Sequence, residues 1–307
     1  MRSQNVAAIV RLPLEVLEVI INFSPLETRL AISRISKLFH SLTLRTLYRE
    51  ISLLSPRMVI NCCRTLASNT GAAATVRSLS ITYTCVFPFL KLVPFIYLIQ
   101  NRYYSSATNS LLASYYTLIR KALSSIPDIH TLRLLVHDPY FVSLLNPSSF
   151  RSLRHFECLL TPSTPLIDFL NRHPKLEYLQ ISPHEDTSET AEAATVILPP
   201  LNLPLLQYFS GNAQHASSLC CSTRLRAAFL SWNAIDTDPE LIFTSLGLSS
   251  RDNLCLLSCR RRGWNLDLLE AASIHLPDLT SLHISNVLLV DSSPTEVCFG
   301  SNVIILI

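Results

Sequence analysis

The residues that could do chemistry in this 307-residue sequence are few, and they form no known catalytic pattern. His184, Glu185 and Asp186 are adjacent and could ligate a metal, but the Ser, Thr, Pro and Glu residues around them are typical of an acidic solvated loop. The sequence has no G-x-S-x-G nucleophile motif, no P-loop and no H-E-x-x-H motif. It therefore predicts no catalytic site, no metal site and no cofactor, and it does not support an enzymatic function.

Nine cysteines are the other candidate ligands or nucleophiles. None belongs to a C-x-x-C pair, and the adjacent pairs Cys62-Cys63 and Cys220-Cys221 do not have the spacing of zinc ligands. We expect no signal peptide, because acidic residues interrupt the first apolar run and no small-residue cleavage site follows it. The cysteines are therefore predicted to be reduced, mostly core thiols of a cytoplasmic or nuclear protein.

Composition argues against several classes of function. The formal net charge of +3 is too small to predict nucleic-acid binding, and Arg260-Arg261-Arg262 is more typical of a solvated turn than of a nuclear signal or phosphate patch. The chain is 49% hydrophobic and has only 5 glycines, which predicts a large core and disfavours glycine-rich phosphate loops. The apolar stretch 86–99 is short for a membrane span and contains Lys91, so we expect a buried irregular segment and no membrane partner.

The elements begin with an unusually apolar helix, predicted over residues 14–23 (LEVLEVIINF). On a helical wheel its polar residues occupy a stripe of roughly 60° and its apolar residues roughly 220°, whereas a surface helix has an apolar stripe only a little over ~100° wide. Such a helix can make two apolar contacts. Either both are core contacts, or one faces its own small domain and the other faces a partner.

A second helix is predicted to follow directly. Ser24, Pro25 and Glu27 have the order of an N-cap, a first-turn proline and the glutamate of a capping box. Apolar residues then recur at spacings of three and four from Leu30 to Tyr48, which indicates more helix. The first ~45 residues are thus expected to form a small helical unit, too small to be stable without further contacts.

These N-terminal residues resemble an F-box. The resemblance covers residues 11 to about 51 and rests on the segments LPLEVL (12–17), II (20–21), ISKLF (35–39) and LYREI (47–51). It implies binding to a Skp-family adaptor and, through the adaptor, to a cullin scaffold. The adaptor-binding residues implied by the resemblance are Leu12, Pro13, Leu14, Leu17, Ile20, Ile35 and Phe39.

Downstream of this unit one short frame, L-x-x-L-x-L, recurs. Four copies have a proline two residues before the first aliphatic residue, and four others are less complete. The intervals are mostly about 19 to 30 residues, close to the ~20–29 residue period of leucine-rich repeats. The first aliphatic residues of the frames are Val76, Ile129, Leu153, Leu176, Leu206, Leu225, Leu254 and Leu279.

Each frame predicts a short strand with one buried face, because its last two apolar positions are two residues apart. Leu179 and Ile181 are therefore expected to face the core and Gln180 to face outward. Helix-like patterns lie between frames, at 111–123, 165–171 and 268–272. Such units bury their apolar face only when they stack on one another.

The frames resemble the irregular leucine-rich repeats that follow an F-box in fungal F-box proteins. The predicted fold is α/β, with an all-helical F-box domain over 1–55, a leucine-rich-repeat-like solenoid over 56–290 and an unassigned tail over 291–307. The resemblance implies a non-catalytic substrate receptor of a cullin-type (SCF) ubiquitin ligase, whose target the sequence does not identify. Two alternatives stay open: a repeat scaffold whose N-terminal helices only cap the solenoid, and an enzyme with an unrecognised site.

Overall fold

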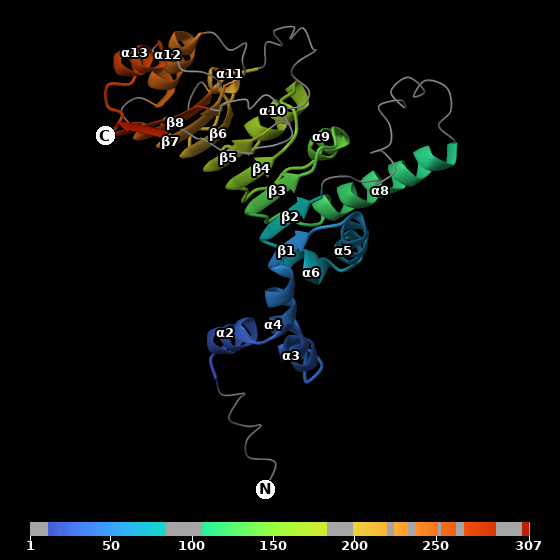
Figure 1. Cartoon of the computed structure of the whole chain (residues 1–307). Helices are drawn as coiled ribbons and strands as arrows, with labels where there is room; N and C mark the ends of the chain where they lie inside the picture. Colours follow the sequence, from blue (N-terminus) through green and yellow to red (C-terminus); the bar gives the residue numbers. More distant parts are fainter. Residues whose placement is uncertain are drawn as a thin grey trace, which may run out of the picture.

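The computed structural model shows a mixed α/β chain, with a small helical unit at its N-terminal end that is joined to one long sheet (Figure 1). The apolar stretch 86–99 and the possible metal ligands His184, Glu185 and Asp186 lie outside the residues that the structure describes. The described residues are 12–83, 106–182, 199–219, 224–232, 238–250, 253–261, 267–286 and 303–306.

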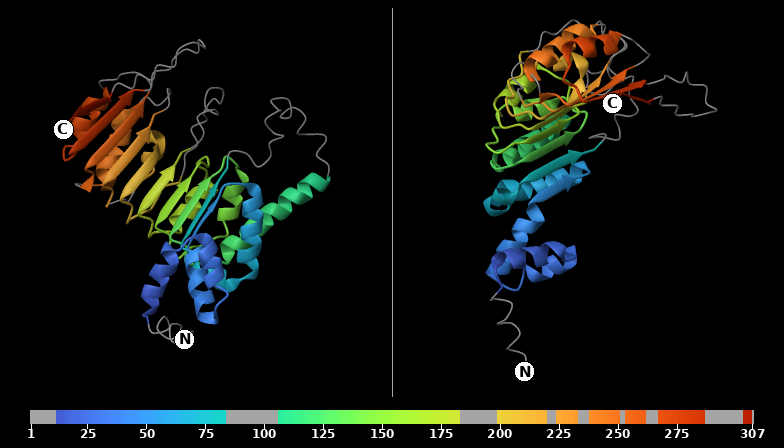
Figure 2. Two further views of the ribbon diagram at one scale, coloured as in Figure 1. Left: turned by 60° about the horizontal axis from the view of Figure 1, so that its bottom comes forward. Right: turned by 90° about the vertical axis from the view of Figure 1, so that its left-hand side faces the viewer.

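Three short helices make up the helical unit: α2 (Leu14–Phe23), α3 (Leu26–Ile32) and α4 (Lys37–Tyr48). The predicted bounds of the first helix are confirmed. The unit has a core of only three buried apolar side chains, because so few residues leave little to pack. These are Leu17, Ile21 and Leu42, against which Ile32 and Phe39 are partly buried. Figure 2 shows the unit projecting from the β1 end of the sheet.

The predicted capping box at Ser24 is wrong. α3 has Pro25 in the N-cap position, in an extended conformation and without a side-chain cap. The Ser24 hydroxyl instead donates to the carbonyl of Ile20, 2.8 Å away, within the preceding helix. The guanidinium of Arg29 donates to the carbonyls of Ser24 and Asn22. Because Arg29 satisfies carbonyls at the end of α2, it fixes the turn between the two helices without a capping box.

Nine parallel strands follow, and each pairs with the next one in the chain. All eight frames predicted from the sequence are confirmed as strands, each of which begins two residues after the first aliphatic residue of its frame. The strands are β1 (Glu50–Leu53), β2 (Ser78–Thr82), β3 (Thr131–Leu135), β4 (His155–Cys158), β5 (Tyr178–Ile181), β6 (Tyr208–Asn212), β7 (Ala227–Ser231), β8 (Leu256–Arg261) and β9 (Ser281–Asn286).

Three details of the strands correct the sequence interpretation. β1 lies within the span assigned to the helical domain, so the sheet begins earlier than predicted. Arg260 and Arg261 are the last residues of β8, not a solvated turn. Within the segment that was left unassigned, Val303–Leu306 form β10, which pairs with β9 in the antiparallel direction and extends the sheet.

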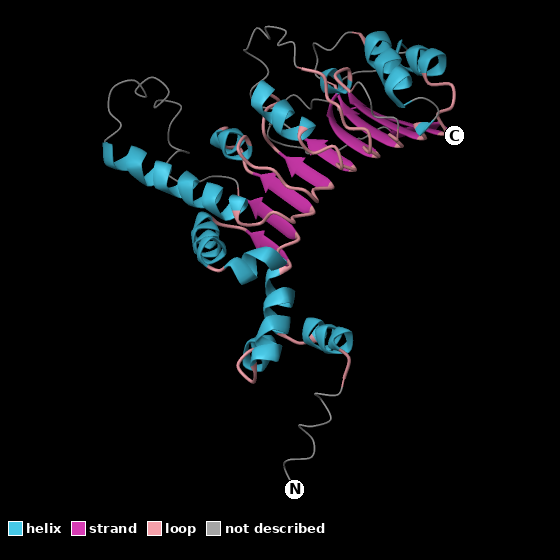
Figure 3. Ribbon diagram, turned by 180° about the vertical axis from the view of Figure 1, so that it is seen from behind, coloured by secondary structure: helices cyan, strands magenta, loops and turns pink. Residues whose placement is uncertain are grey.

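Of the described helices outside the helical unit, all lie on one face of the sheet, and the opposite face is open in the described part of the chain (Figure 3). This placement follows from parallel pairing, since each strand must be reached by a crossover. The helices are α5 (Pro56–Ser68), α6 (Thr70–Thr75), α8 (Ser106–Ser124), α9 (Tyr140–Leu145), α10 (Thr164–Asn171), α11 (Ala213–Ala216), α12 (Pro239–Ser250) and α13 (Asp267–His275).

One backbone pattern recurs at the start of the strands. The carbonyl of the residue just before a strand accepts two hydrogen bonds, one from the N–H group of the residue just before the next strand and one from that of the first residue of the next strand. For example, the carbonyl of Arg154 accepts from Glu177 at 2.8 Å and from Tyr178 at 2.9 Å. We call this series the carbonyl ladder. Its acceptors are Arg49, Arg77, His130, Arg154, Glu177, Gln207, Arg226 and Cys255.

The core consists of the helix-facing rows of the sheet and the apolar sides of the helices. In β5, Leu179 is 0% exposed and Ile181 1%, while Gln180 between them is only half-buried, as predicted. In the next strand the core position beside Ile181 is Gly211. A Cβ on Gly211 would come within 3.2 Å of the Ile181 carbonyl oxygen and 3.0 Å of the Phe209 ring, so only glycine fits there without movement.

The alternation in β5 gives a first test. We expect Leu179→Ala to destabilise the protein by about 2–5 kcal/mol, because it removes a fully buried side chain and leaves a cavity. Gln180→Ala on the same strand should cost about 1 kcal/mol or less, the value of its hydrogen bond from Tyr178. Denaturant midpoints measure both effects, and equal destabilisation would contradict the half-exposed strand.

Candidate functional site

Large apolar side chains on the helical unit remain exposed. Phe23 is 85% exposed, Ile35 67% and Leu26 61%. Scattered exposed apolar residues are normal, but this unit exposes more large apolar side chains than it buries. We call the set the N-terminal apolar surface. It comprises Leu12, Leu14, Val16, Val19, Ile20, Phe23, Leu26, Leu30, Ile35 and Leu38.

Part of this surface is a regular stripe on α2. Val16, Ile20 and Phe23 are spaced by four and three residues, so they share one face of the helix. On α3, Leu26 and Leu30 are four residues apart and share a face in the same way. Helices that bind in the hydrophobic grooves of partner proteins commonly use apolar side chains with this spacing.

The structure separates the residues implied by the F-box resemblance into two groups. Leu12, Pro13, Leu14, Ile20 and Ile35 are exposed, while Phe39 is half-buried against the small core. The prediction for Leu17 is corrected. Its side chain is only 3% exposed, because it packs with Ile21 and Leu42 in the core of the unit and is not available to a partner.

The resemblance missed six exposed residues of the same surface, namely Val16, Val19, Phe23, Leu26, Leu30 and Leu38. The signal for the first three was present in the unusually wide apolar arc of residues 14–23. That arc shows that the helix makes two contacts, but it does not show which side faces inward. The side is decided by α4, whose Leu42 meets Leu17 and Ile21.

A search of the described residues for reactive groups gives little. They contain no group of three or more His, Cys, Asp or Glu side chains that could hold a metal ion. Cys62, Cys63, Cys158, Cys255 and Cys259 are free thiols. Burial raises the pKa of Cys63, Cys158 and Cys259 to about 12, so these thiols stay protonated and are poor nucleophiles at neutral pH. None of the described helices has the length and apolar character to cross a membrane.

The open face of the sheet carries a second surface, a row of stacked rings. The His155 and Tyr178 rings are 3.8 Å apart with planes 6° apart, and those of Tyr178 and Tyr208 are 4.2 Å and 5° apart. Phe229 continues the row at 4.9 Å from Tyr208. We call these four residues the aromatic row. Because the rings cover one another's faces, the row turns mainly ring edges toward the solvent.

The register of the sheet creates this row. His155, Tyr178 and Tyr208 are direct partners in β4, β5 and β6, and Phe229 lies diagonally across from Tyr208 in β7. Neighbouring strands are about 4.8 Å apart, which is close to the stacking distance of aromatic rings. Parallel in-register pairing therefore brings the rings face to face.

Polar groups flank the aromatic row. Arg133 Nε lies 3.0 Å from Glu157 Oε2, and the Tyr178 hydroxyl donates to Gln180 Oε1 at 2.8 Å. Burial, with a smaller contribution from Arg133, lowers the pKa of His155 to about 4. The imidazole is therefore neutral at pH 7. The open face thus presents an uncharged aromatic centre beside an ion pair.

No model of a known protein family matches the sequence, and no curated protein is significantly similar to it. Assignment of a function therefore rests on the N-terminal apolar surface, on the open face of the sheet and on the resemblance of the first residues.

The neutral imidazole of His155 predicts a dependence of stability on pH. Its pKa is about 4 in the folded chain, against 6.5 for an unperturbed histidine, so the unfolded chain binds more protons between these values. Its contribution to stability is complete above about pH 6.5 and declines as the pH falls toward 4. We expect the chain to lose more stability between pH 7 and pH 5 than the variant His155→Tyr, which keeps a ring in the stack.

Thermal unfolding of both proteins at the two pH values measures this difference. His173 and His215 also have pKa values lowered by burial, but they titrate in both proteins, and their contributions cancel in the comparison. An identical loss of stability in the two proteins would contradict a buried neutral imidazole at position 155.

Proposed function

We propose that this chain is a substrate-receptor subunit of a cullin-type ubiquitin ligase. In this proposal the helical unit is an F-box that binds a Skp-family adaptor, and the remaining strands and helices form a leucine-rich-repeat-like solenoid that holds a target protein. The observation that supports it best is the N-terminal apolar surface, because it lies on the residues that resemble an F-box.

The energetics of the helical unit favour a partner. Burial of apolar surface contributes about 25 cal/mol per Å², and a core of three side chains provides little of it. Covering Ile20, Phe23 and Ile35, which are 48%, 85% and 67% exposed, would add apolar burial that the unit lacks alone. A hydrophobic groove in an adaptor would provide this cover.

The arrangement of the sheet supports the second half of the proposal. Strands that pair only with their neighbours in the chain, with helices on one face, are what stacked strand–turn–helix units would produce. The open face then lies free to contact a target over several strands. Such a receptor does no bond chemistry itself. It raises the effective concentration of a target's lysines near the ubiquitin-charged enzyme.

The alternative function is a scaffold in which the helical unit only caps the sheet. α4 continues directly into β1 and contacts α6, so the unit does adjoin the first edge of the array. A terminal cap, however, needs a polar outer face to keep the array soluble. The outer surface of this unit is apolar, which favours a docking role.

Adaptor binding tests the proposal. Phe23→Asp should weaken binding of the chain to a Skp-family adaptor about tenfold or more, because burying such a side chain contributes about 1.5–3 kcal/mol. The variant should unfold at the temperature of the parent, since Phe23 is 85% exposed. Ile20→Asp should behave in the same way.

The matched control is Ile274→Asp on α13, which replaces an apolar residue that is 62% exposed but far along the chain from the helical unit. Titration of purified proteins measures the affinities. If Phe23→Asp and Ile20→Asp bind the adaptor as tightly as Ile274→Asp does, or if the parent chain does not bind it, the proposal is wrong.

A further inference from the structure

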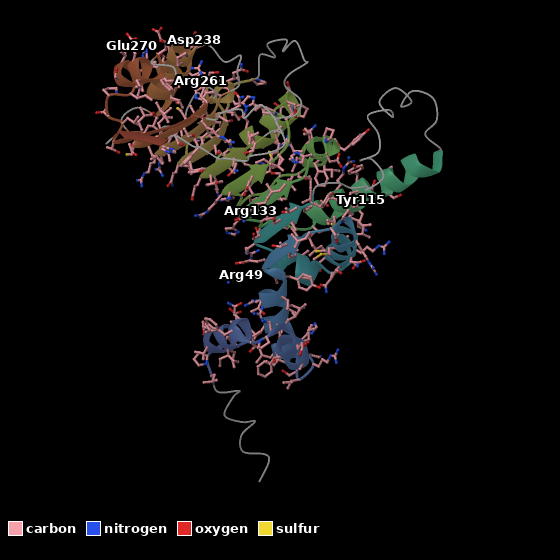
Figure 4. All side chains as sticks on the ribbon, viewed as in Figure 1. Arg49, Tyr115, Arg133, Asp238, Arg261 and Glu270 are labelled. Atoms are coloured by element: carbon pink, nitrogen blue, oxygen red, sulfur yellow. The ribbon has the colours of Figure 1, made fainter. Side chains whose placement is uncertain are left out.

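A hollow of about 490 Å³ lies between the helical unit and the first strands of the sheet. α2 and α4 form one side of it, and the end of α6 with the residue before β2 forms the other. Figure 4 shows Arg49 at this joint, where α4 gives way to β1. The lining residues are Glu18, Arg45, Thr46, Arg49, Ala74, Thr75 and Arg77.

The carbonyl ladder brings two of the arginines together. Arg77 and Ser78 both donate their backbone N–H groups to the carbonyl of Arg49, at 2.9 Å each. Arg49 and Arg77 therefore occupy equivalent positions just before neighbouring strands. Arg45 lies one turn earlier in α4, so it points to the same hollow.

The positive charge of the hollow is only partly compensated. Arg45 Nη1 pairs with Glu18 Oε1 at 3.0 Å. Arg77 Nη1 donates to the carbonyls of Ala74 and Val76, at 2.9 and 3.1 Å. The Arg49 guanidinium has no hydrogen-bond or ion-pair partner among the residues that the structure describes. Three guanidiniums thus face a single carboxylate.

The hydroxyls of the hollow add little to recognition. The Thr46 hydroxyl donates to the carbonyl of Thr43, 3.0 Å away, and that of Thr75 donates to the carbonyl of Ala72, 2.7 Å away. Binding of a ligand therefore falls to the guanidiniums, each of which has five N–H donors in a planar fork. This geometry matches the oxygens of a phosphate group, and the two charges of a phosphate at neutral pH match the excess of two positive charges.

We propose that this hollow binds a phosphate group. Free phosphate and a phosphorylated side chain share this chemistry. The ligand would contact the helical unit through Arg45 and Arg49 and the start of β2 through Arg77, and would hold the joint between them in one arrangement. The site uses no residue of the N-terminal apolar surface, so it stands or falls independently of adaptor binding.

Titration of the full chain with inorganic phosphate, followed by calorimetry and by the unfolding temperature, tests the site. Sodium chloride at equal ionic strength separates binding from general screening. Arg49→Gln should weaken phosphate binding about tenfold or more, the value of a charge-assisted hydrogen bond. It should leave folding intact, because that guanidinium makes no contact to lose in the described structure.

Two further variants provide a control with unchanged phosphate affinity and a variant with increased affinity. Arg64→Gln, on the exposed side of α5, removes the same charge elsewhere and should leave phosphate affinity unchanged. Glu18→Gln should strengthen phosphate binding about threefold, because it removes the competing carboxylate and frees Arg45. If Arg49→Gln and Glu18→Gln bind phosphate as tightly as the parent and Arg64→Gln do, or if the parent does not bind it, the proposal is overturned.

Titrations with peptides identify the source of the phosphate. The probe is a neutral peptide with one phosphoserine, and its unphosphorylated form is the control. Tighter binding of the phosphopeptide than of inorganic phosphate, lost in Arg49→Gln, assigns the site to a phosphorylated protein. Equal affinities assign it to free phosphate. Binding of acetate as tightly as phosphate would overturn the assignment, because the hollow would then recognise a single charge.

Discussion

The carbonyl ladder is the constraint on which the rest of the structure depends. At each step one carbonyl takes both hydrogen bonds that begin the next strand, so the ladder sets where strands start relative to one another. A slip of one residue would turn the core-facing side chains of a strand outward. The continuous core, the aromatic row and the adjacency of Arg49 and Arg77 all follow from this one register.

Most of the sheet could be predicted from the sequence, because the residues that specify each strand lie close together in the chain. A proline, an aliphatic residue and two more aliphatic residues two positions apart specify the end of a helix, a turn and a half-buried strand. β1 and β10 were not predicted, for opposite reasons. β1 is short and follows a helix without a turn, whereas β10 is aliphatic throughout and has no alternation to indicate a face.

The candidate surfaces were less predictable, because they depend on neighbours that the sequence does not place. The width of the apolar arc on α2 indicated a second contact, but only the position of Leu42 shows that Leu17 faces inward. Ser24 has the spacing of an N-cap residue, but its hydroxyl instead donates a hydrogen bond to the carbonyl of Ile20 in α2. For the aromatic row a signal existed: His155, Tyr178 and Tyr208 each stand two residues after the first aliphatic residue of a frame.

A sheet whose strands pair only with chain neighbours has a consequence for how it melts. Its stability is approximately a sum of contributions from neighbouring pairs of units, and each contribution depends on the surface that the two units bury against each other. We call the contact between two neighbouring units a link. At the β6–β7 link the core rows hold Gly211 and Ala228, whereas the neighbouring strands place leucine, isoleucine or phenylalanine at most of the equivalent positions. Because two of the core positions at this link hold the smallest side chains, we expect the array to separate there on heating into an N-terminal and a C-terminal block.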